Sequence, residues 1–149
     1  MRIACSLIAL AATVAATPAL ADTWRLASTG NTEAPDRADY YINTDSVRRD
    51  GDFVNFTTMS VYEQIGSRGY NRAVVQQRGN CASMSSQSLL YNFYAGARLV
   101  ATDNKSIDWT THREGSIAYG ILLTACGKRP YRGDPTSDPD GLSRRQFAH

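Results

Sequence analysis

Few side chains in this 149-residue chain could do chemistry, and two cysteines are the first to consider. Cys81 and Cys126 remain once Cys5 is assigned to the N-terminal leader described below. An even number of cysteines in an exported chain most simply forms one disulfide. This bridge would close a loop of about 45 residues and stabilise the fold by roughly 4 kcal/mol. A metal pair or a reactive thiol is the alternative, but neither cysteine has another Cys or a His at metal-ligand spacing.

The histidines do not indicate catalysis. His112 has Asp108 and Glu114 nearby in the sequence, but no Gly-x-Ser-x-Gly elbow supplies a nucleophile, and His149 is the last residue. If the cysteines are oxidised, thiol catalysis is excluded as well. The sequence therefore predicts a protein that is not an enzyme, with no catalytic residues, no metal site and no cofactor.

Arginine and tyrosine side chains gather on the middle strands and suggest a binding face. These residue types anchor many protein interfaces. A solvated outer face of the sheet is the alternative. A second short motif, the integrin-type tripeptide Arg132-Gly133-Asp134, is predicted to lie in an exposed flexible segment. The predicted binding residues are Arg68, Tyr70, Arg72, Arg78, Tyr94 and Arg98.

The N-terminus and the charge balance define the compartment and exclude several classes of protein. Residues 1–21 carry one charge and a short apolar run, and they end in the small-x-small sequence Ala19-Leu20-Ala21, which is typical of a signal peptide. The whole chain has a formal net charge of +2, too small for nucleic-acid binding by bulk charge. We therefore expect an exported protein of the periplasm, outer surface or medium, at most peripheral to the membrane.

The elements that must position these residues are mostly strands. Alternating apolar and β-branched residues predict five strands with tight turns between them, at 38–42, 53–62, 70–77, 89–94 and 98–102, after a first strand at 23–28. The capping-type residues 43–46 predict a single helical turn through 47–49. In strand 53–62 the apolar residues switch faces, which indicates either a bulge near Thr57-Thr58 or cover on both faces.

One segment near the C-terminus is a convincing helix. Ser116 is a good N-cap, residues 117–126 are almost wholly apolar, and Gly127 and Pro130 end the pattern. We predict an α+β domain over residues 22–127, a single antiparallel sheet of about six strands with this C-terminal helix packed on it. Residues 128–149 contain few large apolar side chains and are predicted to be a disordered tail.

The segment Tyr40-Tyr41-Ile42-Asn43-Thr44-Asp45-Ser46-Val47-Arg48-Arg49 resembles a motif of the surface-adhesin protein E family, although Asn43 stands where the family often carries an acid. Trp24, Cys81 and the helix from Gly115-Ser116 to Cys126 fit the family in order and spacing. The resemblance covers about Trp24 to Gly127. It implies a sheet of about six strands, a helix tethered to it by a Cys81–Cys126 disulfide, and a Gram-negative envelope protein for which a homodimer is a candidate assembly.

The leading hypothesis is a non-enzymatic exported binding module whose partner is a protein, such as a host extracellular-matrix or serum protein. One alternative is a periplasmic small-ligand binder with an apolar groove between sheet and helix and Trp109 or His112 at its mouth. Another is an inhibitor of host lysozyme or a similar hydrolase.

Overall fold

A computed structural model describes residues 21–149 of the chain; residues 1–20 of the predicted signal peptide lie outside the described part. Six long strands form one antiparallel sheet in which each strand pairs with the next along the sequence, and a short seventh strand pairs with the fifth. The strands are β1 (Trp24–Thr29), β2 (Ala38–Asp50), β3 (Phe53–Tyr62), β4 (Arg72–Asn80), β5 (Ser85–Ala95), β6 (Arg98–Asp103) and β7 (Thr110–Thr111). A 3-10 turn, η1 (Gly66–Arg68), joins β3 to β4, and the helices are α1 (Ile117–Ala125) and α2 (Pro139–Phe147).

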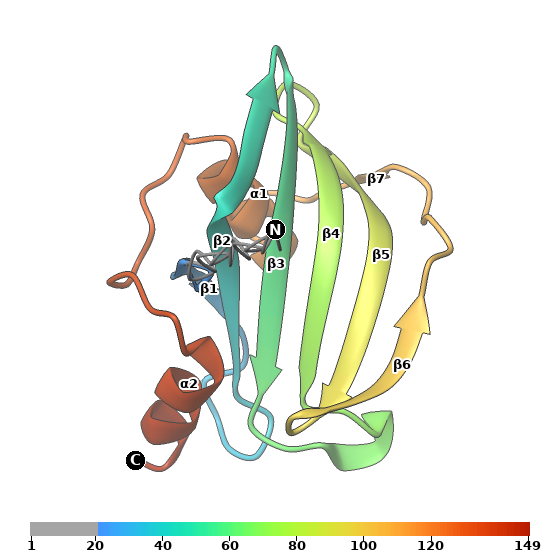
Figure 1. Cartoon of the computed structure of the whole chain (residues 1–149). Helices are drawn as coiled ribbons and strands as arrows, with labels where there is room; N and C mark the ends of the chain where they lie inside the picture. The colour runs from blue at the N-terminus through green and yellow to red at the C-terminus, as the bar shows by residue number, and fades with distance from the viewer. Residues whose placement is uncertain (1–20) are drawn as a thin grey trace, which may run out of the picture.

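The predicted fold is confirmed. The sheet is a simple up-and-down meander, and α1 lies against it at the end that carries β1 and β2 (Figure 1). No helix within residues 21–149 is both long enough and apolar enough to cross a membrane.

Helix α1 begins and ends where its sequence signals predict. The Ser116 hydroxyl accepts a hydrogen bond from the Tyr119 N–H (3.2 Å), and Gly127 follows the helix in the left-handed conformation (φ 72°). Leu122 is almost fully buried and packs directly over Gly79 of β4, where an added Cβ would lie 2.4 Å from the Leu122 Cδ1. Glycine at position 79 therefore lets the helix approach the sheet closely.

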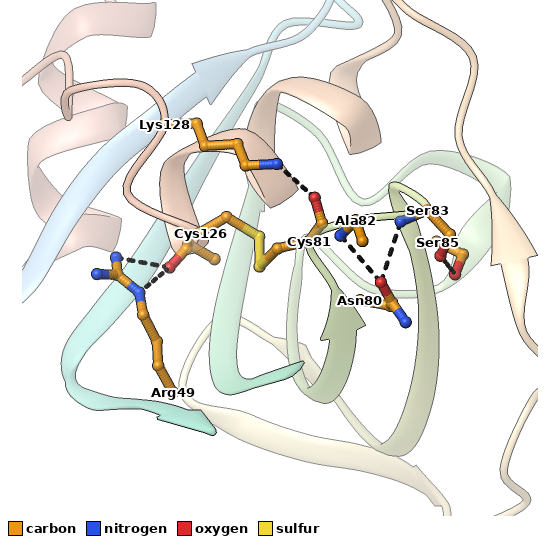
Figure 2. Close-up of a disulfide and its surroundings, with 9 residues drawn as sticks. Arg49, Asn80, Cys81, Ala82, Ser83, Ser85, Cys126 and Lys128 are labelled. Carbon is orange, nitrogen blue, oxygen red and sulfur yellow. Dashed lines mark hydrogen bonds between the residues drawn. A yellow bond between two sulfur atoms is a disulfide. The ribbon is translucent and has the colours of Figure 1, made fainter. Parts of the chain in front are cut away.

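The Cys81–Cys126 disulfide ties the C-terminal end of α1 to the sheet, with 5.7 Å between the two Cα atoms (Figure 2). Around it, the Arg49 guanidinium donates two hydrogen bonds to the Ala125 carbonyl, and the Lys128 ammonium donates to the Cys81 carbonyl. The positive charge of Arg49 at the Ala125 carbonyl offsets the negative end of the α1 dipole.

The predicted helical turn at residues 47–49 is wrong, because β2 continues through this region as a strand. Its pairing with β3 shifts between Asn43 and Arg48, so four residues bulge out opposite one. The capping-type side chains hold this bulge: Asn43 Oδ1 accepts from the Asp45 N–H, and Ser46 Oγ accepts from the Thr57 N–H. Short polar side chains can satisfy a bulged backbone as well as a helix N-terminus, and the sequence pattern did not distinguish the two.

Strand β3 is covered on both faces, which explains its switch of apolar parity. Val54 and Phe56 belong to the buried cluster beneath α1, whereas Met59 and Val61 pack with Leu142 and Phe147 near α2. Pairing between β3 and β4 is regular throughout, so no bulge near Thr57-Thr58 is needed. We call the side of the sheet that carries α1 the α1 face and the opposite side the α2 face.

The prediction of a disordered tail at residues 128–149 is wrong. Thr136 exchanges two 2.8 Å backbone hydrogen bonds with Trp24 of β1, and the Arg132 N–H donates to the Leu26 carbonyl. Ser143 of α2 is fully buried. The segment has too few apolar residues to indicate a core, but its helix packs on a surface that β1–β3 supply.

Candidate binding surfaces

The six predicted binding residues do not form one face. Arg68 and Tyr70 lie on the α1 face: the Arg68 guanidinium is 4.5 Å from the centre of the Tyr62 ring, and the Tyr70 ring contacts Tyr62 and Phe93. Tyr70 precedes the first residue of β4, so strand alternation does not fix its direction.

Arg72 and Tyr94 form a pair on the α2 face. They are directly opposite each other in the β4–β5 register, with the guanidinium 4.4 Å from the ring centre. The Arg72 Nε atom is buried and has no hydrogen-bond partner among the described residues. Cation–π attraction of this kind contributes about 0.5–2 kcal/mol, more when the pair is desolvated.

Arg78 and Arg98 lie at separate places. Arg78 is near the far end of β4, 4.6 Å from the centre of the Phe53 ring on the α2 face. Arg98 is exposed at the start of β6, which forms one edge of the sheet. The structure thus stacks Arg68, Arg72 and Arg78 each on a different aromatic ring, and the six predicted residues do not form a single patch.

A row of aromatic side chains crosses the α1 face from β2 to β5. Successive ring centres are 6.5, 5.9, 4.6 and 5.7 Å apart, in the range of favourable aromatic pairs. Every member is partly exposed, and Arg68 lies beside the row. We call this set the aromatic row; in spatial order it consists of Tyr40, Tyr62, Tyr70, Phe93 and Tyr91.

Of the aromatic row, only Tyr70 was predicted from the sequence to be a binding residue. The alternation of Tyr91 and Phe93 in β5 was the one available signal that those two rings share a face. Tyr40 and Tyr62 join them through the β2–β3 pairing, which a single sequence does not provide. Burial raises the pKa of both Tyr40 and Tyr62, so these hydroxyls stay neutral hydrogen-bonding groups at physiological pH.

A hollow of about 420 Å³ opens on the α2 face near the start of β3. Phe53 and Trp109 meet there edge to face, with ring centres 6.0 Å apart. We call it the Trp109 hollow; its lining residues are Phe53, Arg78, Asn80, Ser85 and Trp109. The predicted groove between sheet and helix is instead filled by buried side chains such as Phe56 and Leu122.

His112 and Ser86 are brought together by the fold, with 2.7 Å between His112 Nε2 and Ser86 Oγ. Burial lowers the pKa of His112. Within residues 21–149, however, no carboxylate forms a hydrogen bond with the imidazole, so the triad geometry is incomplete. The pair joins the loop before α1 to β5, alongside the hydrogen bond from the His112 N–H to the Met84 carbonyl.

The remaining motifs are accounted for by structure. No group of three or more His, Cys, Asp or Glu residues in the described part of the chain is placed to hold a metal ion. The tripeptide Arg132-Gly133-Asp134 is not in a flexible segment, because Arg25 Nε donates to the Gly133 carbonyl (3.1 Å) and β1 binds the Arg132 backbone.

These features define a small disulfide-bonded α+β domain whose surface offers aromatic rings and guanidinium groups for contact. The chain belongs to the surface-adhesin protein E family, whose model matches residues 24–127. Family membership supports a surface-adhesin-like role, with a protein as partner and an exported surface location. Searches of curated proteins and of solved structures each found no match. The family match ends at Gly127, so α2 lies outside it.

Proposed function

We propose that this protein is a non-enzymatic exported adhesion module that binds a host extracellular-matrix or serum protein through the aromatic row. The single observation that carries the proposal is the row itself, a line of partly exposed rings on the part of the α1 face beyond the α1 helix. Membership of an adhesin family supports the class of partner.

The chemistry of the row suits a protein segment. Tyrosine combines a large contact area with a hydroxyl and loses little conformational entropy when it is held, and tyrosine and arginine dominate interface hot spots. A small hollow of about 180 Å³, lined in part by Tyr40, Tyr62, Arg68 and Ile117, lies at one end of the row. We expect the partner to supply an apolar or aromatic side chain for this hollow and an acidic residue for Arg68.

The test is surface capture of the mature protein on immobilised matrix and serum proteins. Tyr70→Ala removes the central ring of the row and is expected to weaken binding about tenfold or more. Tyr94→Ala is the matched control, because Tyr94 is also a partly exposed tyrosine but lies on the α2 face. Unfolding midpoints of both variants check that the fold is intact.

Equal losses of binding in Tyr70→Ala and Tyr94→Ala would contradict the assignment of the α1 face. Failure of the wild-type protein to bind any of these proteins, beside a family adhesin that does bind, would contradict the adhesive role itself.

For location, we propose export with cleavage after Ala21 and display at the outer surface. N-terminal sequencing of protein from the producing cells should begin at Asp22. Protease treatment of intact cells should degrade the protein if it is displayed, whereas protection until the outer membrane is permeabilised would place it in the periplasm.

For assembly, we propose a homodimer formed through β6. Residues 132–136 cover the β1 edge, whereas β6 has no partner strand beyond it among the described residues. Two antiparallel β6 strands related by a two-fold axis would place Arg98 of each copy opposite Asp103 of the other. Arg98→Asp should weaken a dimer seen by light scattering, and the double variant Arg98→Asp with Asp103→Arg should restore it; a monomeric wild type contradicts the proposal.

The two sequence-based alternatives remain predictions with direct tests. A periplasmic small-ligand binder requires a spectral or thermal shift on titration with haem or fatty acids. An inhibitor of host lysozyme requires loss of lysozyme activity at excess protein.

A further inference from the structure

The Trp109 hollow is a second candidate site, separate from the aromatic row and on the opposite face of the sheet. Four regions of the chain meet there: the start of β3, the end of β4, the start of β5 and the loop before β7. Its volume of about 420 Å³ is within the range of small-molecule sites.

Among the described residues, none forms an ion pair with the Arg78 guanidinium in the hollow. Within residues 21–149, Arg78 forms no ion pair and no side-chain hydrogen bond. Its neighbours in the strand register are Asn55 on β3 and Gln87 on β5, both uncharged. Because the guanidinium is stacked 4.6 Å from the centre of the Phe53 ring, its N–H groups remain available to a carboxylate, which arginine binds in a bidentate geometry.

The walls of the hollow are aromatic, and their outer surface is accessible. The Trp109 side chain is 42% exposed although it is one of the largest apolar residues of the chain. Its edge-to-face contact with Phe53 fixes the angle between the two rings. An exposed indole held in this way offers a flat apolar surface, to which the C–H face of a sugar ring is complementary.

Neutral polar groups complete the site. Asn80 Oδ1 accepts hydrogen bonds from the Ala82 and Ser83 N–H groups (2.9 and 3.0 Å), so the amide orientation is fixed and its Nδ2 remains available as a donor (Figure 2). Ser85 Oγ lies 2.7 Å from Ser83 Oγ. Cys81, next to Asn80, anchors this turn to α1 through the disulfide. A site held this rigidly loses little entropy when a ligand binds.

From this arrangement we propose that the Trp109 hollow binds an acidic saccharide. Arg78 binds the sugar carboxylate, Trp109 lies against the ring, and Asn80 and Ser85 form hydrogen bonds with hydroxyl groups. A fatty acid would satisfy Arg78 but not the two polar side chains, and a neutral sugar would leave the guanidinium without a partner. The Trp109 hollow and the aromatic row are independent sites, because they share no residue.

The experiment compares two probes that differ only at the carboxylate, methyl β-D-glucuronide and methyl β-D-glucoside. Binding to the mature protein is followed by ligand-observed NMR and by tryptophan fluorescence. We expect saturable binding of the glucuronide and at least tenfold weaker binding of the glucoside. Arg78→Gln should weaken glucuronide binding at least tenfold, and Trp109→Ala should abolish the fluorescence change.

Arg72→Gln is the matched control, since Arg72 is on the same strand and also stacks on an aromatic ring of the α2 face. It should leave glucuronide binding unchanged. Equal binding of the two probes, equal loss in both arginine variants, or binding of acetate as tight as that of the glucuronide would overturn the proposal. Absence of binding to either probe at millimolar concentration would overturn it as well.

Discussion

Helices α1 and α2 are each nine residues long, yet they pack on opposite faces of the sheet in different ways. α1 is apolar, places Ile121, Leu122 and Ala125 in the core, and is tethered by the disulfide. α2 is mostly polar and buries Pro139 and Ser143. α1 is thus specified by its own residues, whereas α2 is specified by the surface that receives it.

Beside the apolar packing of Leu142 and Phe147, buried hydrogen bonds to β2 hold α2. The Tyr41 hydroxyl is 2.7 Å from Ser143 Oγ, which in turn donates to Asp39 Oδ2 at 2.7 Å. Burial raises the pKa of Tyr41 to about 12, so this hydroxyl keeps its proton and can donate to Ser143. At the C-terminal end, the Arg37 guanidinium donates to the Phe147 carbonyl and lies 5.4 Å from the centre of its ring.

Loss of the disulfide should have the largest effect and should act mainly on α1. Cys126→Ser is expected to lower the free energy of unfolding by roughly 4 kcal/mol, because the loop between the cysteines is no longer closed in the unfolded chain. Urea titration measures the loss. In the Cys126→Ser variant, the amides of α1 should lose more protection from hydrogen exchange than those of α2. A greater loss in α2 would contradict the role of the disulfide in holding α1.

Leu122→Ala should have the next largest effect. The side chain is almost fully buried above Gly79, so its truncation leaves a cavity and is expected to cost about 3 kcal/mol. Leu123→Ala is the matched control in the same helix, and because Leu123 is only half-buried its loss should be clearly smaller. Equal losses in thermal unfolding would show that α1 does not pack over Gly79.

Ser143→Ala should destabilise the attachment of α2 without affecting α1. The change leaves the Tyr41 hydroxyl and the Asp39 carboxyl without their shared partner, at an expected cost of about 2 kcal/mol. Ser137→Ala, an exposed serine just before the helix, should change stability little. The measurement is hydrogen exchange of α2 amides, and unchanged protection would contradict the polar attachment.

The smallest effect is a pH dependence confined to α2. Burial raises the pKa of Asp39 against the opposing effects of Ser143 and Arg37, so the folded state holds the proton more tightly than the unfolded state does. The ionised carboxylate therefore costs stability at neutral pH, and this cost decreases as the pH falls through the raised folded pKa toward the ordinary aspartate value.

Asp39→Asn removes this titration and keeps an acceptor for Ser143. Its advantage in unfolding free energy over the wild type should be greatest near pH 7 and should shrink as the pH falls. A difference that stays constant from pH 7 to pH 4 would mean that Asp39 does not titrate differently in the two states. Arg37 lowers the pKa of Glu63, so Glu63 contributes to the pH dependence of stability with the opposite sign. This contribution is present in both the wild type and Asp39→Asn, and it cancels when the two proteins are compared.

The α1 half of the fold could be predicted because its signals are local. Alternation defined the strands, and Ser116 and Gly127 bounded the helix. α2 had a local signal too, since Asp138 caps it and Pro139 occupies its first turn, but its polar sequence gave no reason to expect packing. The switch of apolar residues from one face of β3 to the other was better evidence for α2. A strand with apolar residues on both faces needs a packing element on each side of the sheet.

The binding surfaces were harder to predict because they depend on which residues share a face. Tyr70 and Arg72 are two residues apart and were expected together, but the backbone bends at Asn71, just before β4 begins. Their side chains consequently lie on opposite faces. The residue types alone indicated that arginines would contact aromatic rings. Only the strand register shows on which face of the sheet each contact lies.

The backbone pairing of Trp24 with Thr136 has a consequence for the order of events during synthesis. A ribosome makes β1 long before it makes residues 132–136, so the outer edge of β1 stays open until that later segment has been made. Until then Trp24, which is buried in the finished protein, has neither its neighbour strand segment nor α2 beside it. Completion of the fold is therefore a closing step that joins β1 to the segment between α1 and α2, and a nascent protein stopped at Gly127 would keep that edge open.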